Sequence, residues 1–202
     1  MNCMVREAKT RVRQRVLSVL KTLGDEESAR ASTAARRLLQ QQPQWQEAKS
    51  VLLFAPMAGE LDIWPLVGEA LAEGRVVALP RFDRVTRCYS ACRIQSCEQD
   101  IKPGHFGIRE PATHCDRISL NRLDLILVPG LAFDVHGHRL GKGKGYYDQM
   151  LAGVRGVTCG VGFDQQIVEH IPVEPHDVDL KCILTPTRWV NCLRGSWNEL
   201  AG

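Results

Sequence analysis

A series of short apolar runs, each bounded by glycine, proline or polar residues, constrains the fold of this chain more than any other feature. Most of these runs are apolar at successive positions, which is typical of strands covered by helices on both faces of a sheet. They cover residues 50–55, 75–79, 123–128, 157–162 and 181–184, with an irregular edge strand at 88–98. Helical patterns alternate with them at 65–73, 147–152 and 165–170. The alternation predicts an α/β fold with an open, mostly parallel sheet and helices on both faces, in a three-layer, Rossmann-like arrangement.

A pair of helices is expected before the first strand, over residues 4–23 and 25–41. The apolar residues that recur at helical spacing in the first of them are Val12, Val16, Val19, Leu20 and Leu23. At about 100° per residue, Arg6, Lys9 and Arg13 fall together on one border of this apolar stripe. We therefore expect some of these basic side chains to face the body of the protein rather than solvent.

The length and charge of the chain bound its organisation and its partners. It has 202 residues and no linker rich in proline, glycine or serine, so we expect a single domain over residues 1–202. Lys and Arg number 26 against 23 Asp and Glu, and a net charge of +3 lacks the broad basic surplus typical of nucleic-acid-binding proteins. The sequence itself indicates no oligomeric state, and a monomer is the expectation.

The sequence also bears on location. No run approaches the roughly 18 consecutive apolar residues that a membrane span requires, and the first residues contain no apolar signal core. The eight cysteines are scattered through a chain of ordinary hydrophobic content, unlike those of the short secreted chains that disulfides hold together. We therefore expect a cytoplasmic protein with reduced thiols and no association with membranes.

The segment 134–148 is distinctive because glycine alternates with basic residues in it. It follows an apolar strand and precedes a helix, and loops at the carboxyl ends of parallel strands commonly bind ligands. Closely spaced glycines let backbone N–H groups converge on an anion, beside the positive end of the following helix. The residues that carry the pattern are Gly141, Gly143 and Gly145, together with Arg139, Lys142 and Lys144. The segment therefore predicts a polyphosphate site.

Two common phosphate-binding motifs do not fit this segment. A Walker A loop requires G-x4-G-K-[ST], and both the spacing and the final hydroxyl are missing. A dinucleotide fingerprint requires G-x-G-x-x-G, and Tyr146 stands where the last glycine would be. The simpler alternative is a flexible turn whose lysines only keep the protein soluble. The segment lies between a strand and a helix, and two aromatic residues and an acid follow it directly, which favours a ligand site.

The segment 139–148, RLGKGKGYYD, resembles the signature of the 5-formyltetrahydrofolate cyclo-ligases, also called methenyltetrahydrofolate synthetases. Six further blocks resemble segments of that family in the family's order, and together they span nearly the whole chain. These blocks are residues 9–13, 57–60, 107–111, 128–134, 162–166 and 184–186. Many bacterial members have another glycine where this chain has Lys144, but other members also carry lysine there.

The resemblance implies a ligase of one-carbon metabolism that converts 5-formyltetrahydrofolate and ATP, with Mg2+, into 5,10-methenyltetrahydrofolate, ADP and phosphate. A formamide oxygen is a poor leaving group, so the γ-phosphoryl group of ATP is first transferred to it. N10 then attacks the resulting iminium phosphate and expels phosphate. The protein has to align the reactants and neutralise charge on the phosphoryl oxygens. The resemblance assigns this catalytic role to Lys142 and Lys144.

The resemblance also implies an ATP site, formed by the glycine-rich segment and two residues of the first helix. This set comprises Lys9, Arg13, Arg139, Leu140, Gly141, Lys142, Gly143, Lys144, Gly145, Tyr146 and Tyr147. Of the two tyrosines, one is expected in the core, because adjacent residues at a helix start point in different directions. Mg2+ is expected at Asp148 and Asp177, since one or two carboxylates together with phosphate are sufficient for this ion.

For the folate, the resemblance implies a carboxylate and part of the same glycine-rich segment. The expected substrate-binding residues are Glu60, Gly143, Lys144, Gly145 and Tyr146. The carboxylate of Glu60 can accept hydrogen bonds from the pterin ring, and a tyrosine offers a flat apolar wall with a hydroxyl group. The overlap with the ATP site is expected, because the two substrates must meet within bonding distance.

Two other functions remain open from the sequence. One is a non-catalytic module on the same fold that binds nucleotide or RNA through the basic residues Arg6, Lys9, Arg11, Arg13 and Arg15. The other is an ATP-dependent ligase or kinase that acts on a different small amide. The presence of Glu60, Lys142, Lys144 and Asp148 favours an enzyme over the binding module.

Overall fold

A computed structural model describes residues 3–104, 107–192 and 196–199, the last stretch as backbone only. The α-helices are α1 (Cys3–Leu20), α2 (Asp25–Gln40), α3 (Pro43–Gln46), α4 (Pro65–Ala72) and α5 (Tyr146–Leu151), with short 3-10 helices η2 (Leu120–Arg122) and η3 (Asp164–Gln166). The remaining residues of the expected domain 1–202 lie outside this description. Within the described residues, no helix combines the length and the hydropathy needed to cross a bilayer.

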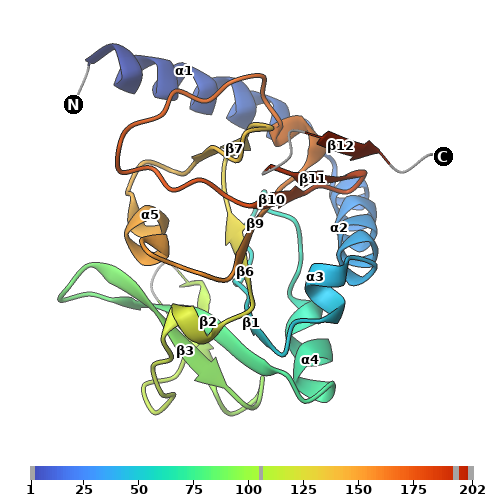
Figure 1. Ribbon diagram of the computed structural model, residues 1–202, viewed down its shortest axis with the longest axis vertical. Helices are drawn as coiled ribbons and strands as arrows, with labels where there is room; N and C mark the ends of the chain where they lie inside the picture. Colours follow the sequence, from blue (N-terminus) through green and yellow to red (C-terminus); the bar gives the residue numbers. More distant parts are fainter. Residues whose placement is uncertain (1–2, 105–106, 193–195, 200–202) are drawn as a thin grey trace.

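The strands form one large sheet and two short hairpins (Figure 1). The large sheet contains β1 (Ser50–Leu52), β2 (Val76–Asp83), β3 (Cys88–Ile94), β6 (Leu125–Pro129), β9 (Val157–Val161), β10 (Cys182–Leu184), β11 (Arg188–Asn191) and β12 (Ser196–Glu199). The hairpins pair β4 (Ile101–Pro103) with β5 (Arg109–Pro111), and β7 (Ala132–Phe133) with β8 (Arg139–Leu140).

The large sheet has eight strands in the order β12-β11-β10-β9-β6-β1-β2-β3. The five central strands β10, β9, β6, β1 and β2 are parallel, whereas β3, β11 and β12 are antiparallel additions at the two edges. The predicted open, mostly parallel sheet is therefore confirmed, and so is the edge strand expected at 88–98. From β1 the chain continues to β2 on one side, and β6, β9 and β10 build the other side, so the strand order reverses between β1 and β6.

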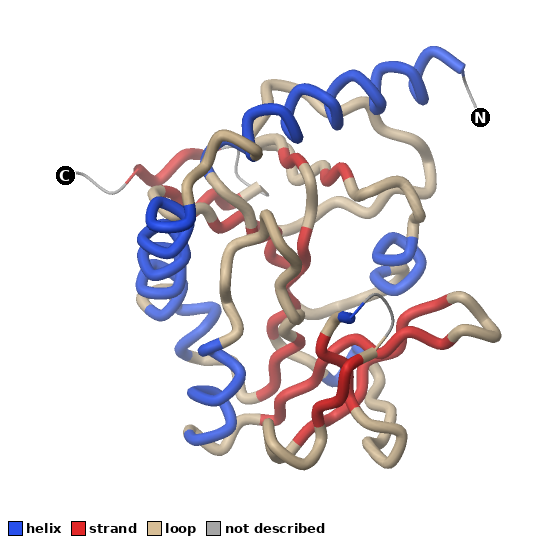
Figure 2. The backbone as a smooth tube through the Cα atoms, turned by 180° about the vertical axis from the view of Figure 1, so that it is seen from behind, coloured by secondary structure: helices blue, strands red, loops and turns tan. Residues whose placement is uncertain are grey.

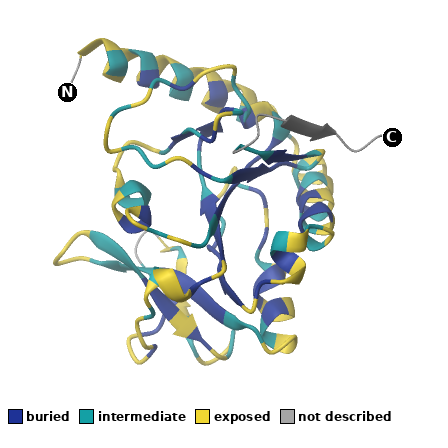
Figure 3. Cartoon of the chain, in the orientation of Figure 1, coloured by how far each residue is buried: buried dark blue, intermediate teal, exposed yellow. Residues whose placement is uncertain are grey.

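Both faces of the sheet are buried, because successive residues of its central strands point to opposite sides. On β1, Val51 packs in a cluster that includes apolar residues of α2, α3 and α4. Its neighbour Leu52 packs in a second cluster, which contains Met150 and Leu151 of α5. The central strands are accordingly dark blue in Figure 3, with exposed positions on the outer sides of the helices. The predicted three layers are thus present.

The N-terminal helix α1 does not cover either face of the sheet, although α2 does. It lies across one end of the sheet, over the β7–β8 hairpin, as both backbone views show (Figures 1 and 2). Val16 is its most buried apolar residue and packs with Leu131, Leu140 and Ile171. Val19, expected in the apolar stripe, is 38% exposed, so the buried stripe is narrower than the sequence predicts.

The helix predicted at 165–170 is wrong, since only the 3-10 turn η3 forms there. The side-chain amide of Gln166 donates hydrogen bonds to the carbonyl oxygens of Gly130 and Leu131, which fixes this residue against the end of β6. The next residues continue in an extended path beside β7, where the N–H of Val168 donates to the carbonyl oxygen of Phe133. Pairing with β7 thus replaces the helical hydrogen bonds.

Candidate active site

A cavity of about 350 Å³ opens where the strand order reverses, beyond the carboxyl ends of β1 and β6. In open α/β sheets this is the expected position of a ligand site, and the volume lies within the range of small-molecule pockets. Most of its wall is apolar or aromatic, with a few charged side chains at one end. The lining includes Phe54, Pro80, Tyr89, Ile108, Leu131 and Tyr146, and on the charged side Glu60, Arg139, Lys142, Lys144 and Asp148.

The glycine-rich segment has two structurally different halves, which the sequence does not distinguish. Residues 132–140 form the β7–β8 hairpin, closed by the fully buried Asp134. This carboxylate accepts hydrogen bonds from the N–H groups of His136, His138 and Ile171 and lies 2.8 Å from the His138 ring. Only the following turn, residues 141–145, is open along the cavity.

The open turn has the backbone conformation that its glycines permit. Gly143 and Gly145 have φ angles of 97° and 67°, in the left-handed region that side chains disfavour. Residues 142–145 are all exposed, so this turn lies at the surface of the protein. The helix that follows, α5, has only six residues, so its dipole adds less to an anion site than a long helix would.

Lys142 joins the turn to the acid that was predicted to bind the folate. Its Nζ lies 2.9 Å from Oε1 of Glu60 and 3.2 Å from Sδ of Met57. The other oxygen of Glu60 accepts a hydrogen bond from the Met57 N–H, and this carboxylate is largely buried while the lysine is half-exposed. The two groups are 82 residues apart in the chain and share one cavity. Lys144, the other predicted catalytic residue, lines the same cavity.

Tyr89 of β3 and Tyr146 and Tyr147 of α5 form an aromatic wall of the cavity, and Phe82 of β2 packs against it. The Tyr146 ring lies 5.1 Å from that of Phe82 and 5.7 Å from that of Tyr89, between ring centroids. Tyr147 packs with apolar residues of the second core cluster, and burial raises the pKa of its hydroxyl. Burial also raises the pKa of Tyr89, with smaller contributions from nearby acids and from Tyr146. Tyr147 is therefore the more deeply packed tyrosine of the adjacent pair.

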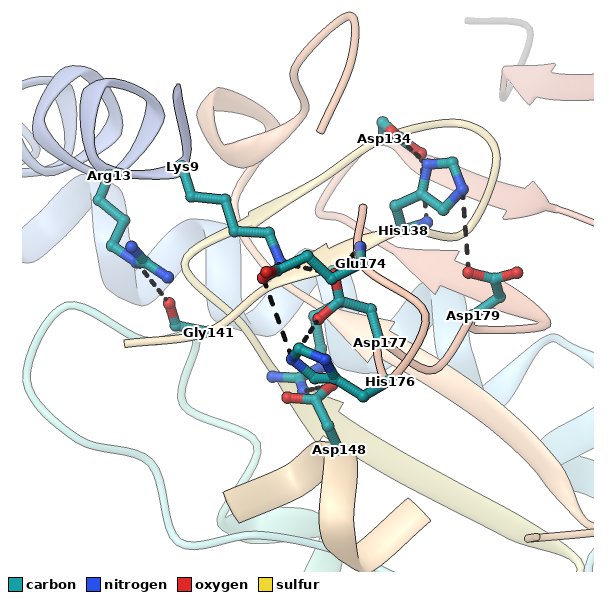
Figure 4. A network of polar contacts seen from close by, with 11 residues as sticks. Lys9, Arg13, Asp134, His138, Gly141, Asp148, Glu174, His176, Asp177 and Asp179 are labelled. Atoms are coloured by element: carbon teal, nitrogen blue, oxygen red, sulfur yellow. Dashed lines mark hydrogen bonds and ion pairs between the residues drawn. The ribbon is translucent and has the colours of Figure 1, made fainter. Parts of the chain in front are cut away.

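Lys9 points inward from α1, as its position in the helix predicts, and is only 7% exposed. Its Nζ contacts two carboxylates of the loop before β10, Glu174 at 3.0 Å and Asp177 at 2.5 Å (Figure 4). Oδ2 of Asp177 also accepts the N–H of Glu174, and the His176 ring lies 3.8–3.9 Å from both acids. A buried cation thus lies between two acids, one of which was predicted to bind Mg2+.

Arg13 also points inward and contacts the glycine turn. Its Nε donates a hydrogen bond of 3.0 Å to the carbonyl oxygen of Gly141 (Figure 4). Partial burial lowers the pKa of the Arg13 guanidinium, an effect that the charge of Asp177 opposes. Arginine remains a cation throughout the physiological range. Helix α1 therefore contacts both the glycine turn and the loop 174–177, whereas Arg6 is exposed.

Arg139 and Asp148 contact each other across the turn. The guanidinium Nη2 lies 2.6 Å from Oδ1 of Asp148, and the arginine side chain is only 3% exposed. Its Nε is buried and has no hydrogen-bond partner among the described residues. Leu140, also predicted in the ATP site, has its side chain in the apolar cluster beneath α1. Leu140 is therefore buried and is not part of the cavity wall, and its carbonyl oxygen accepts a hydrogen bond from the Leu131 N–H.

Sequence reasoning did not identify several residues that belong to this site. Glu174 binds Lys9 beside Asp177. The only feature of the sequence that pointed to Glu174 was its position three residues before Asp177. Tyr89 and Phe82 come from the edge hairpin β2–β3, which carries no motif. Arg109 lines the cavity from within a block, 107–111, that had been recognised without a role. Of the predicted Mg2+ ligands, Asp177 clusters with Glu174 and His176, whereas Asp148 is paired with Arg139.

Comparison with known proteins identifies one family. The model of the 5-formyltetrahydrofolate cyclo-ligase family matches residues 5–186 of this chain. A 5-formyltetrahydrofolate cyclo-ligase of Mus musculus is 30% identical over 196 residues, which cover 89% of this chain and 94% of the relative. The enzyme of that name from Escherichia coli K12 is 33% identical over 149 residues, covering 70% of this chain and 80% of the relative.

Solved structures agree with the architecture. The NMR structure of Aquifex aeolicus 5,10-methenyltetrahydrofolate synthetase superposes with a TM-score of 0.83 at 34% identity, covering 96% of this chain and 97% of that one. A 5,10-methenyltetrahydrofolate synthetase from Mycoplasma pneumoniae gives a TM-score of 0.69 at 20% identity, with coverages of 88% and 98%. The second likeness concerns the fold alone. Together these neighbours confirm the predicted α/β class.

Proposed function

Because this chain belongs to the 5-formyltetrahydrofolate cyclo-ligase family and is a ligase, we propose that it cyclises 5-formyltetrahydrofolate to 5,10-methenyltetrahydrofolate with ATP and Mg2+. ADP and phosphate are the other products. In this proposal the pterin end of the folate occupies the apolar cavity, and the triphosphate of ATP lies along the turn 141–145. The two substrates then meet beside Lys142.

One observation carries this proposal, namely the 2.9 Å contact between Lys142 and Glu60 at the cavity. A cation on an open glycine turn suits phosphate, and a largely buried carboxylate suits the N–H groups of a pterin. Their contact means that a phosphate and a pterin bound to these groups would be neighbours. The aromatic wall that includes Tyr146 and Tyr89 supplies apolar surface for a flat ring system, and Phe82 supports both rings.

The proposed chemistry requires positioning and charge neutralisation more than covalent participation by the protein. The formyl oxygen attacks the γ-phosphorus of ATP, and the bond to ADP breaks. N10 then bonds to the formyl carbon, the carbon–oxygen bond to phosphate breaks, and N10 loses its proton. Lys142 and Lys144 line the cavity and can stabilise the negative charge on the transferred group. Arg13 holds the turn by its bond to Gly141.

The residues of the loop 174–177 fit a Mg2+ site. Glu174 and Asp177 present carboxylate oxygens close together, and the ammonium group of Lys9 already lies between them as a cation. Mg2+ is commonly held by one or two carboxylates together with substrate phosphates. Bound there, it would neutralise charge on the phosphate oxygens of ATP. Asp148 contributes in this proposal only if its ion pair with Arg139 rearranges.

A direct assay tests the proposal. Purified protein mixed with 5-formyltetrahydrofolate, ATP and Mg2+ should produce the near-ultraviolet absorbance of the methenyl product together with equimolar ADP. Omission of ATP should abolish the signal, and removal of Mg2+ by a chelator should reduce it strongly. Binding of both substrates without any absorbance change would instead favour the non-catalytic module. Release of ADP only with other small amides would favour a different ATP-dependent ligase or kinase.

A further inference from the structure

A second hollow adjoins the cavity, and no residue of the glycine turn 141–145 lines it. It has a volume of about 250 Å³ and shares Ala55, Met57, Glu60 and Arg109 with the main cavity. Its remaining wall includes Asp62 and Trp64, which come just before α4 in the chain. Because four residues line both spaces, the two form one continuous binding surface.

Arg109 lies at the junction of these two spaces and has an unusual environment for an exposed arginine. Its guanidinium carbon lies 4.4 Å from the centroid of the Trp64 ring, a cation–π contact. Within the described part of the chain it makes no ion pair. Its backbone is held in the β4–β5 hairpin opposite Pro103. The guanidinium is thus fixed in place while its charge remains available to an anion.

The folate substrate of the proposed reaction has an anionic end, for which the site described so far offers no binding residues. A tetrahydrofolate extends from its pterin ring through a p-aminobenzoyl group to a glutamate with two carboxylates. A cavity of about 350 Å³ can hold a pterin, but a ligand of this length must extend beyond it. On the glycine-turn side the carboxylates would meet the phosphates of ATP, and like charges repel. The other direction in which the tail of the folate can extend is past Arg109 and into the second hollow.

We propose that Arg109, held against Trp64, recognises the glutamate carboxylates of the folate substrate, and that the second hollow receives this end of the molecule. The inference rests on the proposed function for the identity of the substrate. Arginine presents a planar fork that can bind a carboxylate with two parallel hydrogen bonds. Contact with the tryptophan face reduces the freedom that the side chain loses when it binds. Arg109 is therefore a specificity-determining residue for the tail rather than a catalytic one.

Asp62 allows a second test of whether charge in this hollow governs the binding of the glutamate carboxylates. It lines the same hollow, and its Oδ1 accepts a hydrogen bond of 3.0 Å from the N–H of Trp64. Its negative charge opposes the binding of a carboxylate nearby, whereas Arg109 favours it. The charge of Glu60 is already neutralised by Lys142. Removing the charge of Asp62 should therefore strengthen tail binding, and removing that of Arg109 should weaken it.

The test compares two substrates that differ only in the glutamate. The dissociation constants of 5-formyltetrahydrofolate and of 5-formyltetrahydropteroamide, in which a neutral primary amide replaces the glutamate, are measured by calorimetry for the natural chain and for Arg109→Gln. The variant should bind the glutamate-bearing compound about tenfold more weakly and the truncated one with unchanged affinity. Asp62→Asn should bind the glutamate-bearing compound more tightly. Arg84→Gln is the matched control, because Arg84 is exposed and lies outside both hollows.

The outcomes separate this inference from the proposed function. Equal weakening of both compounds by Arg109→Gln, or no weakening of either, would overturn the role of Arg109 even if the natural chain forms the methenyl product. If the natural chain forms no product, the proposed function fails, while the binding comparison still decides whether Arg109 reads the carboxylates. In an active enzyme, the KM for 5-formyltetrahydrofolate should rise with ionic strength in the natural chain but much less in Arg109→Gln.

Discussion

Replacement of Lys9 by methionine should destabilise the fold and at the same time create a site for a divalent cation. The lysine side chain is 9% exposed, and the carboxylates that it neutralises, on Glu174 and Asp177, are 14% and 15% exposed. Methionine retains most of the apolar stem but none of the charge. The variant therefore leaves two largely buried acids facing each other without their cation.

The magnitude follows from this burial. Removal of one partner from a buried ion pair typically costs about 3–5 kcal/mol, and the residual solvent access here lowers our expectation to about 2–4 kcal/mol. For a chain of this length, each kcal/mol corresponds to roughly 2–4 °C in Tm. The triple variant K9M/E174Q/D177N, in which the two acids are also neutral, should recover most of the loss because no charge remains buried.

Urea denaturation followed by circular dichroism measures these differences, and Lys21→Met is the matched control. Lys21 is exposed, so this change should alter the free energy of unfolding by less than about 0.5 kcal/mol. Without nucleotide, millimolar Mg2+ should stabilise K9M by about 1 kcal/mol, since the ion binds only the folded acids. It should have little effect on the natural chain or on the triple variant, where the acids are occupied or absent.

Two results would refute this reasoning. A loss below about 1 kcal/mol in K9M would mean that the ion pairs contribute little beyond their desolvation cost. A triple variant no more stable than K9M would mean that the loss arises from the packing of α1 and not from unpaired charge. Failure of Mg2+ to stabilise K9M, with the expected destabilisation present, would argue against the metal assignment of Glu174 and Asp177.

Four other substitutions test the site and the fold. Lys142→Ala should lower kcat about 100-fold with little change in the KM for the folate, whereas Glu60→Ala should raise that KM about tenfold. Steady-state kinetics in which each variant changes both parameters equally would contradict this division of roles. Gly143→Ala should lower kcat/KM about tenfold. It should also lower the free energy of unfolding, measured by urea denaturation, by about 1–2 kcal/mol, because a side chain is strained at a φ of 97°. Unchanged kinetics would show that the turn does not hold phosphate. The hydrogen bond from the Ser50 hydroxyl lowers the pKa of Asp124 below its usual value. Burial opposes this effect, and the backbone N–H groups of Lys49 and Ser50 add to it. The contribution of Asp124 to stability is therefore present above about pH 4 and lost at lower pH. Because Asp124 is exposed, Asp124→Asn should cost only about 0.5–1 kcal/mol at pH 7, and progressively less in urea titrations below pH 4.

The sheet was predictable from the sequence because its central strands are apolar on both faces. The run at 123–128 became β6 and the run at 157–162 became β9, each shifted by at most two residues. The segment 165–170 was misassigned because the alternation of strands with helices predicted a helix there, whereas Ile167 and Val168 pair with a strand. Their partner, β7, lies more than 30 residues earlier, and a local pattern contains no information on that pairing.

The candidate site was predictable in its residue types but not in its pairings. Glycines and lysines at 141–145 indicated an open, basic turn, and the turn is exposed as expected. The contact of Lys9 with Asp177 joins residues 168 positions apart, and Lys142 meets Glu60 across 82. Such contacts depend on where the sheet brings the loops. The resemblance to the family named both members of each pair, yet it did not indicate that they touch.

The position of α1 has a consequence for the order in which the molecule is assembled. This helix leaves the ribosome before its partners, Leu131, Leu140 and Ile171 among them, which are synthesised more than 110 residues later. A nascent chain that stops before Glu174 contains neither of the acids that neutralise Lys9. Closure of so long a loop is slow compared with local helix formation, so we expect α1 to dock last. Completion of the nucleotide end of the cavity then coincides with the final step of folding.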